Sequence, residues 1–119
     1  MELKTVLSEL VASLSPLDFV SSIDLRTEAF ILKGRVLFRI RGFLEIYFKE
    51  QTQTLAVAWI EEDRRTWGVD RDNLRGWHRH PFENPESHQP IPAVTMSEII
   101  REFVGVWSSS AEPPSFERK

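Results

Sequence analysis

The apolar residues of this chain change their spacing along the sequence, and that change limits the folds open to it. Between residues 3 and 14 they recur every three or four positions, as on the core-facing side of an amphipathic helix. Ser15-Pro16 follows directly and predicts the end of the helix. The stripe consists of Leu3, Val6, Leu7, Leu10, Val11 and Leu14.

From Phe19 onward apolar and polar residues alternate, which indicates strands with one buried face. The alternation favours one long strand over roughly residues 28–40 rather than a hairpin at Lys33-Gly34. Arg41-Gly42 predicts the turn into the next strand, FLEIYF. The alternating positions that share one parity are Phe30, Leu32, Val36, Phe38 and Ile40.

Two further segments, LAVAWI and TWGVD, also look like strands and follow the polar segments EQTQT and EEDRR. The chain therefore predicts a mostly antiparallel meander of four or five strands. Both parities of LAVAWI are apolar. This strand is expected to be central and covered on both faces, or covered by a partner.

Residues 71–94 contain four prolines and no sustained periodicity, so we expect a long loop there. Thr95-Met96-Ser97-Glu98 has the form of a capping box and predicts the start of a second helix. Its apolar stripe is Met96, Ile99, Ile100, Phe103, Val104 and Trp107. The sequence thus predicts one α+β domain over residues 1–107, with both amphipathic helices packed on the sheet. Residues 108–119 are expected to form a disordered tail.

Composition narrows the classes of function. The chain has 119 residues, no cysteine and a formal net charge of −3. Disulfides and thiolate metal sites are therefore excluded, and bulk electrostatic attraction to nucleic acid is not expected. The N-terminus lacks the basic segment of a secretory signal, and no later apolar run is long enough for a membrane span. We expect a cytoplasmic protein without membrane contact.

The stretch DRDNLRGWHRHPF, from Asp70 to Phe82, is the most distinctive part of the chain. His80 precedes Pro81, which favours an extended backbone, so His78 and His80 are expected to face one site. One hypothesis is a ribonuclease-type pair, in which one imidazole removes the proton of a ribose 2′-hydroxyl and the other protonates the leaving oxygen. Such a pair requires neither a metal nor another cofactor.

Two alternatives remain open for the same stretch. His78 and His80 could supply two nitrogens to zinc, with His88, Asp72 or Glu83 as the third ligand. Alternatively, His78 and Trp77 pack the loop onto the sheet and have no chemical role. The interpretation that we carry forward assigns no metal ligand and no cofactor.

The ribonuclease hypothesis also assigns functions to the other polar residues of this stretch. Asp72 would orient the histidines, and Arg75 or Arg79 would neutralise the phosphorane. Asp72-Asn73 is also typical of a turn, and Trp77 could stack on a base or anchor the loop. The predicted catalytic residues are thus His78, His80, Asp72 and Arg75, and the predicted substrate-binding residues are Asn73, Trp77, Arg79 and Arg71. A basic cleft of Arg35, Arg39, Arg65, Arg71 and Arg79 would favour this hypothesis.

Taken together, these features resemble a known family. An apolar strand, then W-x-x-D-x-D-N, then a loop rich in histidine and proline, then an amphipathic helix, is similar to TumE-type toxin–antitoxin proteins. The resemblance covers roughly residues 20–105 and is carried mainly by residues 58–103. Asp72, Asn73, His78 and His80 match the family's D-N-x-P-H-H segment. The chain departs from it through the inserted residues 74–76 and through Trp77, which stands where proline is usual.

Two hypotheses from different classes follow. The resemblance implies a toxin with an antitoxin protein as partner, and the loop residues suggest a metal-independent ribonuclease acting on RNA. The alternative is a non-enzymatic interaction module that binds a partner protein or self-associates. A homo-oligomer is expected because LAVAWI and its neighbours have more apolar positions than two helices can cover.

Overall fold

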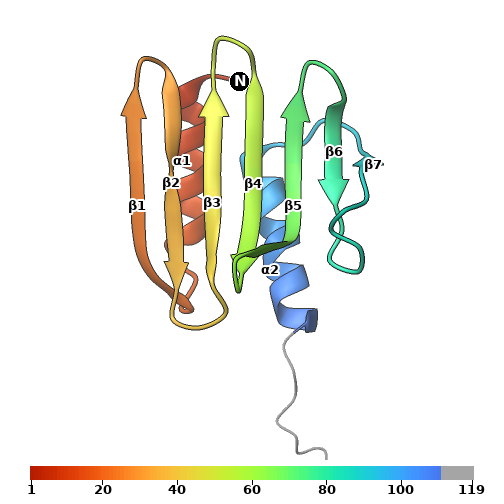
Figure 1. Ribbon diagram of the computed structural model, residues 1–119. Coiled ribbons are helices and arrows are strands. Elements are labelled where there is room, and N and C mark those ends of the chain that lie inside the picture. Colours follow the sequence, from red (N-terminus) through yellow and green to blue (C-terminus); the bar gives the residue numbers. More distant parts are fainter. Residues whose placement is uncertain (111–119) are drawn as a thin grey trace, which may run out of the picture.

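The computed structural model describes residues 1–110 and confirms the α+β class. It is an antiparallel sheet in the order β1-β2-β3-β4-β5-β6-β7, with both helices on one face (Figure 1). The elements are α1 (Leu3–Leu14), β1 (Val20–Glu28), β2 (Ile31–Phe38), β3 (Phe43–Lys49), β4 (Thr54–Glu61), β5 (Arg64–Asp72), β6 (Gly76–His80), β7 (Gln89–Pro90) and α2 (Met96–Ser110).

Both helices lie where the apolar stripes predicted them. In α1 the buried residues are Val6, Leu10 and Leu14, which belong to the predicted stripe. At the start of α2 the capping box forms, since Glu98 N donates to Thr95 Oγ1 at 3.1 Å and Thr95 N donates to Glu98 Oε1 at 2.8 Å. The helix runs to Ser110, and the rest of the expected tail, residues 111–119, lies outside the described residues.

The expected number of four or five strands is too low, because the sheet has seven. The long strand predicted at about residues 28–40 is β2, and β1 precedes it as a separate strand. β1 was missed because it lies at the sheet edge, where most of its side chains are exposed and its apolar alternation is weak. A strand at an edge needs less apolar surface than a central one.

The other missed strands lie in residues 71–94, which were expected to be loop. β5 extends to Asp72 and pairs with β6, which in turn pairs with the two-residue strand β7. Polar residues occur on both faces of β6, so apolar periodicity could not reveal it. Pro90 is tolerated in β7 because an edge strand need not donate on both sides.

The core lies between the sheet and the two helices. At its centre, Phe103 of α2 contacts Trp59, Trp67 and Phe38, with ring centroids 5.5 Å apart in each pair. The fully buried side chains also include Leu10, Leu14, Leu32, Leu44, Ile46, Phe48, Leu55, Ile99 and Ile100. Burial of this much apolar surface is the main stabilising contribution.

The opposite face of the sheet, which we call the open face, is covered by no helix of the described residues (Figure 1). LAVAWI forms most of β4, the middle strand, so its predicted central position is confirmed, but the described helices cover only one of its faces rather than both. Its helix-side residues are buried, whereas Ala56 and Ile60 on the open face are only half-buried. Among residues 1–110, no helix has the length and apolarity that crossing a membrane requires.

The turn between β2 and β3 depends on a glycine. Arg41 and Gly42 both have positive φ, at 67° and 87°. A Cβ at Gly42 would lie 1.9 Å from the carbonyl oxygen of Ile60, so no other residue fits without displacing the backbone of β4. The turn predicted at this dipeptide is confirmed.

Candidate metal centre

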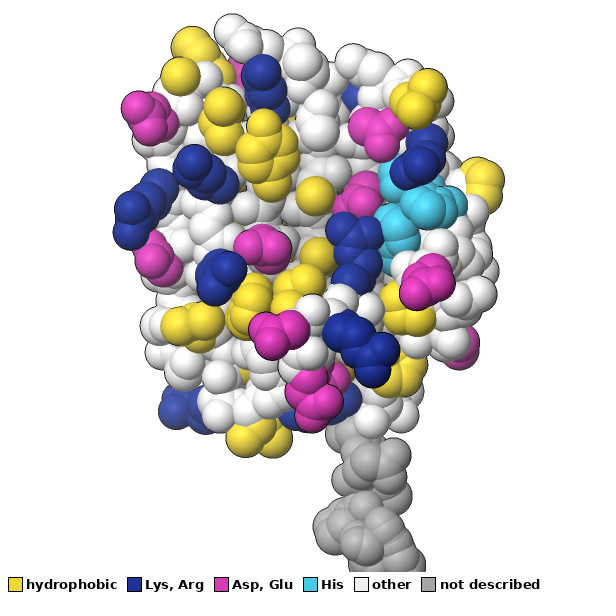
Figure 2. All heavy atoms as spheres, in the orientation of Figure 1, with side chains coloured by type: hydrophobic (Ala, Val, Ile, Leu, Met, Phe, Trp, Pro, Cys, Tyr) yellow, Lys and Arg dark blue, Asp and Glu magenta, His cyan; other side chains and the backbone are white. Residues whose placement is uncertain are grey.

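Pairing between β5 and β6 brings the histidines to one carboxylate. Asp70 lies directly opposite His78, and Gly68 lies directly opposite His80. Directly opposed residues of an antiparallel pair point to the same face, and here that is the open face. A Cβ at Gly68 would lie 2.9 Å from the carbonyl oxygen of Val57 and 3.6 Å from Cδ of Arg65, so a larger residue there would crowd β4 and Arg65. Figure 2 shows the histidines as one group at the edge of the open face.

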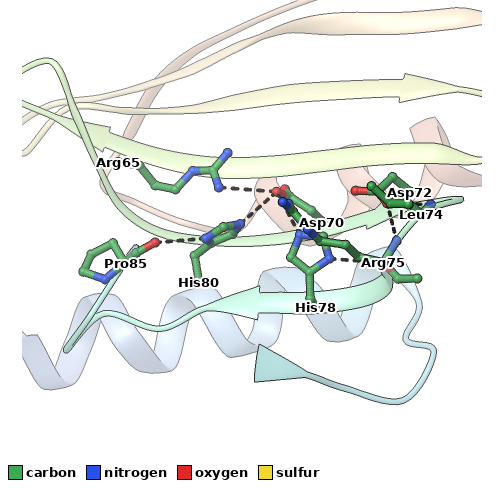
Figure 3. Close-up of polar contacts among 9 residues, drawn as sticks. Arg65, Asp70, Asp72, Leu74, Arg75, His78, His80 and Pro85 are labelled. Atoms are coloured by element: carbon green, nitrogen blue, oxygen red, sulfur yellow. Dashed lines mark hydrogen bonds and ion pairs between the residues drawn. The ribbon is translucent and has the colours of Figure 1, made fainter. Parts of the chain in front are cut away.

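His80 uses both ring nitrogens. Its Nδ1 lies 2.9 Å from the carbonyl oxygen of Pro85, and its Nε2 lies 3.1 Å from Asp70 Oδ2 (Figure 3). A carbonyl oxygen can only accept, so Nδ1 carries the hydrogen and Nε2 is the atom turned to Asp70. The residue is 5% exposed, and its orientation is therefore fixed by surrounding protein rather than by water.

His78 repeats this arrangement from the next position on the same face. Its Nδ1 donates to the carbonyl oxygen of Gly76 at 3.2 Å, and its Nε2 lies 3.6 Å from the same Oδ2 atom of Asp70. It is 3% exposed. Both buried histidines thus hold their Nδ1 against a backbone carbonyl and turn their Nε2 toward one oxygen.

Asp70 has two very different oxygens. Oδ2 also accepts from Arg65 Nη1 at 3.3 Å, so three side chains converge on it. Oδ1 is buried and has no hydrogen-bond partner among the described residues. A buried carboxylate oxygen without a hydrogen-bond partner is costly, so this oxygen is a candidate for contact with a ligand.

His88, between β6 and β7, completes a group of three imidazoles. One ring nitrogen from each of His78, His80 and His88 lies within 4.8 Å of the others. His88 is exposed. Partial desolvation by neighbouring segments lowers its pKa, and the positive charge of Arg75 adds to the decrease. Both effects favour the neutral imidazole, which has a free lone pair.

The predicted catalytic residues are brought together only in part. His78 and His80 meet, but Asp72 does not bond to them. Its Oδ1 instead accepts from the backbone N–H groups of Leu74, at 2.9 Å, and Arg75, at 2.6 Å. These bonds lower the pKa of Asp72, that from Arg75 most. This is the turn chemistry considered for Asp72-Asn73.

The predicted substrate-binding residues lie away from the histidines. Trp77 and Arg79 belong to the helix-covered face, where Trp77 packs against the core and Arg79 pairs with Glu102 of α2. Arg71 donates to the carbonyl oxygen of Gln53 and to Asn73 Oδ1, both at 3.0 Å, and so supports the turn between β3 and β4.

The five arginines of the predicted cleft do not converge. Arg35 pairs with Glu45, and Arg39 donates to the carbonyl oxygen of Asp18. Arg65 alone contacts the histidine and carboxylate group, through Asp70. Their charges are therefore distributed over both faces of the sheet.

Sequence reasoning did not assign Asp70 to the site and named Arg65 only as part of a basic cleft. Asp70 stands at the start of the distinctive stretch, but its role depends on the pairing of β5 with β6. If β6 had been recognised as a strand, the turn at residues 73–75 would have placed Asp70 opposite His78. Arg65 was expected only in a basic cleft with four other arginines, and its contact with Asp70 depends on the fold.

Comparison of the chain with family models, curated proteins and solved structures gave no significant match. The resemblance to TumE-type proteins therefore stays a prediction from the sequence alone.

Proposed function

We propose that this protein binds a single divalent transition-metal ion through His78, His80, His88 and Asp70. The observation that supports this most strongly is the shared orientation of the two buried histidines. Each holds its Nδ1 hydrogen against a backbone carbonyl and turns Nε2 toward Asp70 Oδ2. Metal-binding histidines typically donate their other ring N–H to a carbonyl or carboxylate, which fixes the ring and its tautomer.

A cation placed between these atoms would stabilise their arrangement. If both imidazoles are neutral, the lone pair of each Nε2 points at an oxygen that also offers lone pairs, and the atoms repel. Two added protons would resolve this repulsion, and so would one metal ion shared by both rings. Oδ1 of Asp70 has no hydrogen-bond partner among the described residues, so this carboxylate keeps an accepting oxygen beyond the one that contacts the histidines and Arg65.

The distances suit a small tetrahedral ion. Zinc bonds of about 2.0–2.1 Å to nitrogen and oxygen place neighbouring ligand atoms roughly 3.3 Å apart. Asp70 Oδ2 lies 3.1 Å and 3.6 Å from the two Nε2 atoms. The ligating nitrogens of the three histidines lie within 4.8 Å of one another, so a modest inward movement would bring them to this spacing. Imidazole ligands favour zinc and its neighbours over calcium or magnesium, which prefer oxygen ligands.

The proposed role of the metal is structural. Three imidazoles and one carboxylate fill a tetrahedral site, and closed zinc sites stabilise folds. The ion would join β5, β6 and the connection that contains His88. In the described structure this connection is tied to the sheet by the short strand β7 and by the bond between His80 and Pro85.

The test is zinc titration of the full chain after removal of metals with EDTA. Calorimetry and elemental analysis should give one zinc per chain, and cobalt should give the visible absorption of a tetrahedral site. Melting temperature should rise, since free zinc at 100 times Kd stabilises by about 2.7 kcal/mol.

Asp70→Asn and Asp72→Asn form a matched pair for this titration. Loss of an outer-shell partner weakens metal binding by roughly 10- to 100-fold, so loss of the ligand Asp70 should weaken it by at least as much. Asp72→Asn should bind zinc like the wild type, because Asp72 bonds to backbone amides. Equal affinity of both variants, or no zinc binding by the wild type, would refute the proposed centre.

A metal-independent ribonuclease of the TumE toxin type is a second proposal for the same histidines. It is supported by a shallow hollow of about 480 Å³ on the open face. The lining of this hollow contains none of the histidines; it includes the acidic residues Asp24 and Glu45 together with Arg65, Lys33, Arg35 and Tyr47. Cations and an aromatic ring are suited to single-stranded RNA. Antitoxin binding belongs to this proposal.

Two experiments separate the proposals. A ribonuclease should cleave RNA in excess EDTA with a bell-shaped pH profile, and Arg65→Ala should slow it. If the site is a metal centre, the Arg65→Ala variant should bind zinc as tightly as the wild type or more tightly. The reason is that this change removes a cation that competes with zinc for Asp70. If neither zinc binding nor cleavage occurs, the interaction module is the proposal that survives.

A further inference from the structure

The two edges of the sheet differ in their capacity to pair with another strand. At one edge, β7 has two residues, and one of them is Pro90, which has no N–H to donate. At the other edge, β1 has nine residues and no proline. Within residues 1–110, no strand pairs with the outer side of β1. A long unpaired edge is a template for an added strand.

The exposed side chains of β1 have opposite charges at neighbouring positions on one face. Asp24 and Arg26 lie opposite Arg35 and Lys33 and therefore belong to the open face. Their charged groups are 3.6 Å apart, and the side chains of Arg26 and Asp24 are 77% and 66% exposed. On the other face, apolar Ile23 is 38% exposed. The edge therefore offers both charge and uncovered apolar surface.

We propose that two copies of the chain associate through antiparallel pairing of their β1 strands, with Leu25 of one copy opposite Leu25 of the other. Directly opposed residues share a face. Asp24 of each copy then lies opposite Arg26 of the second copy, so the two-fold axis forms two ion pairs. On the helix-covered face, Leu25 meets its counterpart and Ile23 meets Thr27.

The charges select this register. A pair centred on Asp24 or on Arg26 places identical charges directly opposite each other, which is destabilising. Pairing Arg26 with Glu28 also matches opposite charges, but the strands then overlap only over residues 26–28. The register centred on Leu25 pairs residues 22–28 and so provides a longer main-chain ladder together with two ion pairs.

The resulting dimer has one continuous sheet, with all four helices on one side and the open faces on the other. The histidine groups lie near the far edges, five or six strands from β1 in the sheet order. The dimer therefore does not depend on the proposed metal centre, and each proposal can fail without the other.

Sedimentation velocity of the full chain over a concentration series tests the interface. The wild type should form a dimer at high concentration. Asp24→Arg and Arg26→Asp each place like charges opposite each other and should sediment as monomers. An equimolar mixture of the two variants restores opposite charges at both positions and should again give a dimer.

Circular dichroism and melting of each variant provide the fold control, because both side chains are exposed. The proposal is overturned if the wild type is monomeric at all concentrations, or if the single variants dimerise like the wild type. A mixture that stays monomeric, while both variants are folded, also overturns the register. Zinc affinity should be the same in both variants.

Discussion

The two faces of β6 both present polar side chains, but those side chains are engaged differently. On the helix-covered face, Arg79 forms two bonds to Glu102, at 2.6 Å and 2.9 Å, and the Trp67 indole donates to the same carboxylate at 3.2 Å. On the open face, His78 and His80 converge on Asp70, one of whose oxygens has no partner among the described residues.

The difference separates groups that complete the fold from groups that can accept a ligand. The bonds of Arg79 and Glu102 are satisfied within the protein, and they attach α2 to the sheet. On the open face, Nε2 of His78, Nε2 of His80 and Nη1 of Arg65 all lie 3.1–3.6 Å from one oxygen of Asp70. Convergence of several possible ligand atoms on one point, rather than polarity itself, distinguishes a candidate site.

The largest difference between the two faces is expected when each loses an aromatic ring. Phe103→Ala removes a fully buried side chain at the centre of the core and should lower the free energy of unfolding by about 3–5 kcal/mol. Phe43→Ala on the open face should cost about 1 kcal/mol or less, mainly through its contact with Arg35. Urea unfolding of both variants measures the contrast, and equal losses would contradict it.

A smaller effect is expected from the carboxylate that joins α2 to the sheet. Glu102→Ala leaves Arg79 and the Trp67 indole without their common acceptor. Because a hydrogen bond to a charged group contributes roughly 1.5–3 kcal/mol, the free energy of unfolding should fall by about that amount. Glu102→Gln keeps an acceptor and should cost less. Zinc affinity should be unchanged in both variants, and a marked decrease would show that the two faces are coupled.

The smallest effect is expected at Asp72, next to the histidines in sequence but outside their group. Its pKa is lowered chiefly by the backbone N–H of Arg75, so its contribution to stability is present above the unfolded-state pKa and is lost as pH falls through the lower folded-state value. Asp72→Ala should lower the melting temperature slightly at neutral pH, whereas Asp72→Asn keeps an accepting oxygen. If Asp72→Ala melts like the wild type between neutral and acidic pH, the turn bonds do not stabilise the fold.

Much of the fold could be predicted because the relevant signals are local. The stripe from Leu3 to Leu14, the capping box at Thr95 and the turn at Arg41-Gly42 each depend on residues a few positions apart. The edge strand β1 and the strands β6 and β7 could not be predicted in this way. Their side chains are exposed, or find polar partners far along the chain, so they leave no apolar pattern.

The sequence by itself determined the two helices and the central strands, and it predicted that His78 and His80 face one side. Only the tertiary structure decided that they meet Asp70 rather than Asp72, and that Trp77 and Arg79 belong to the core side. The physical reason is register. The pairing of β5 with β6 sets which side chains lie opposite each other, and a shift by one residue would turn every one of them to the other face.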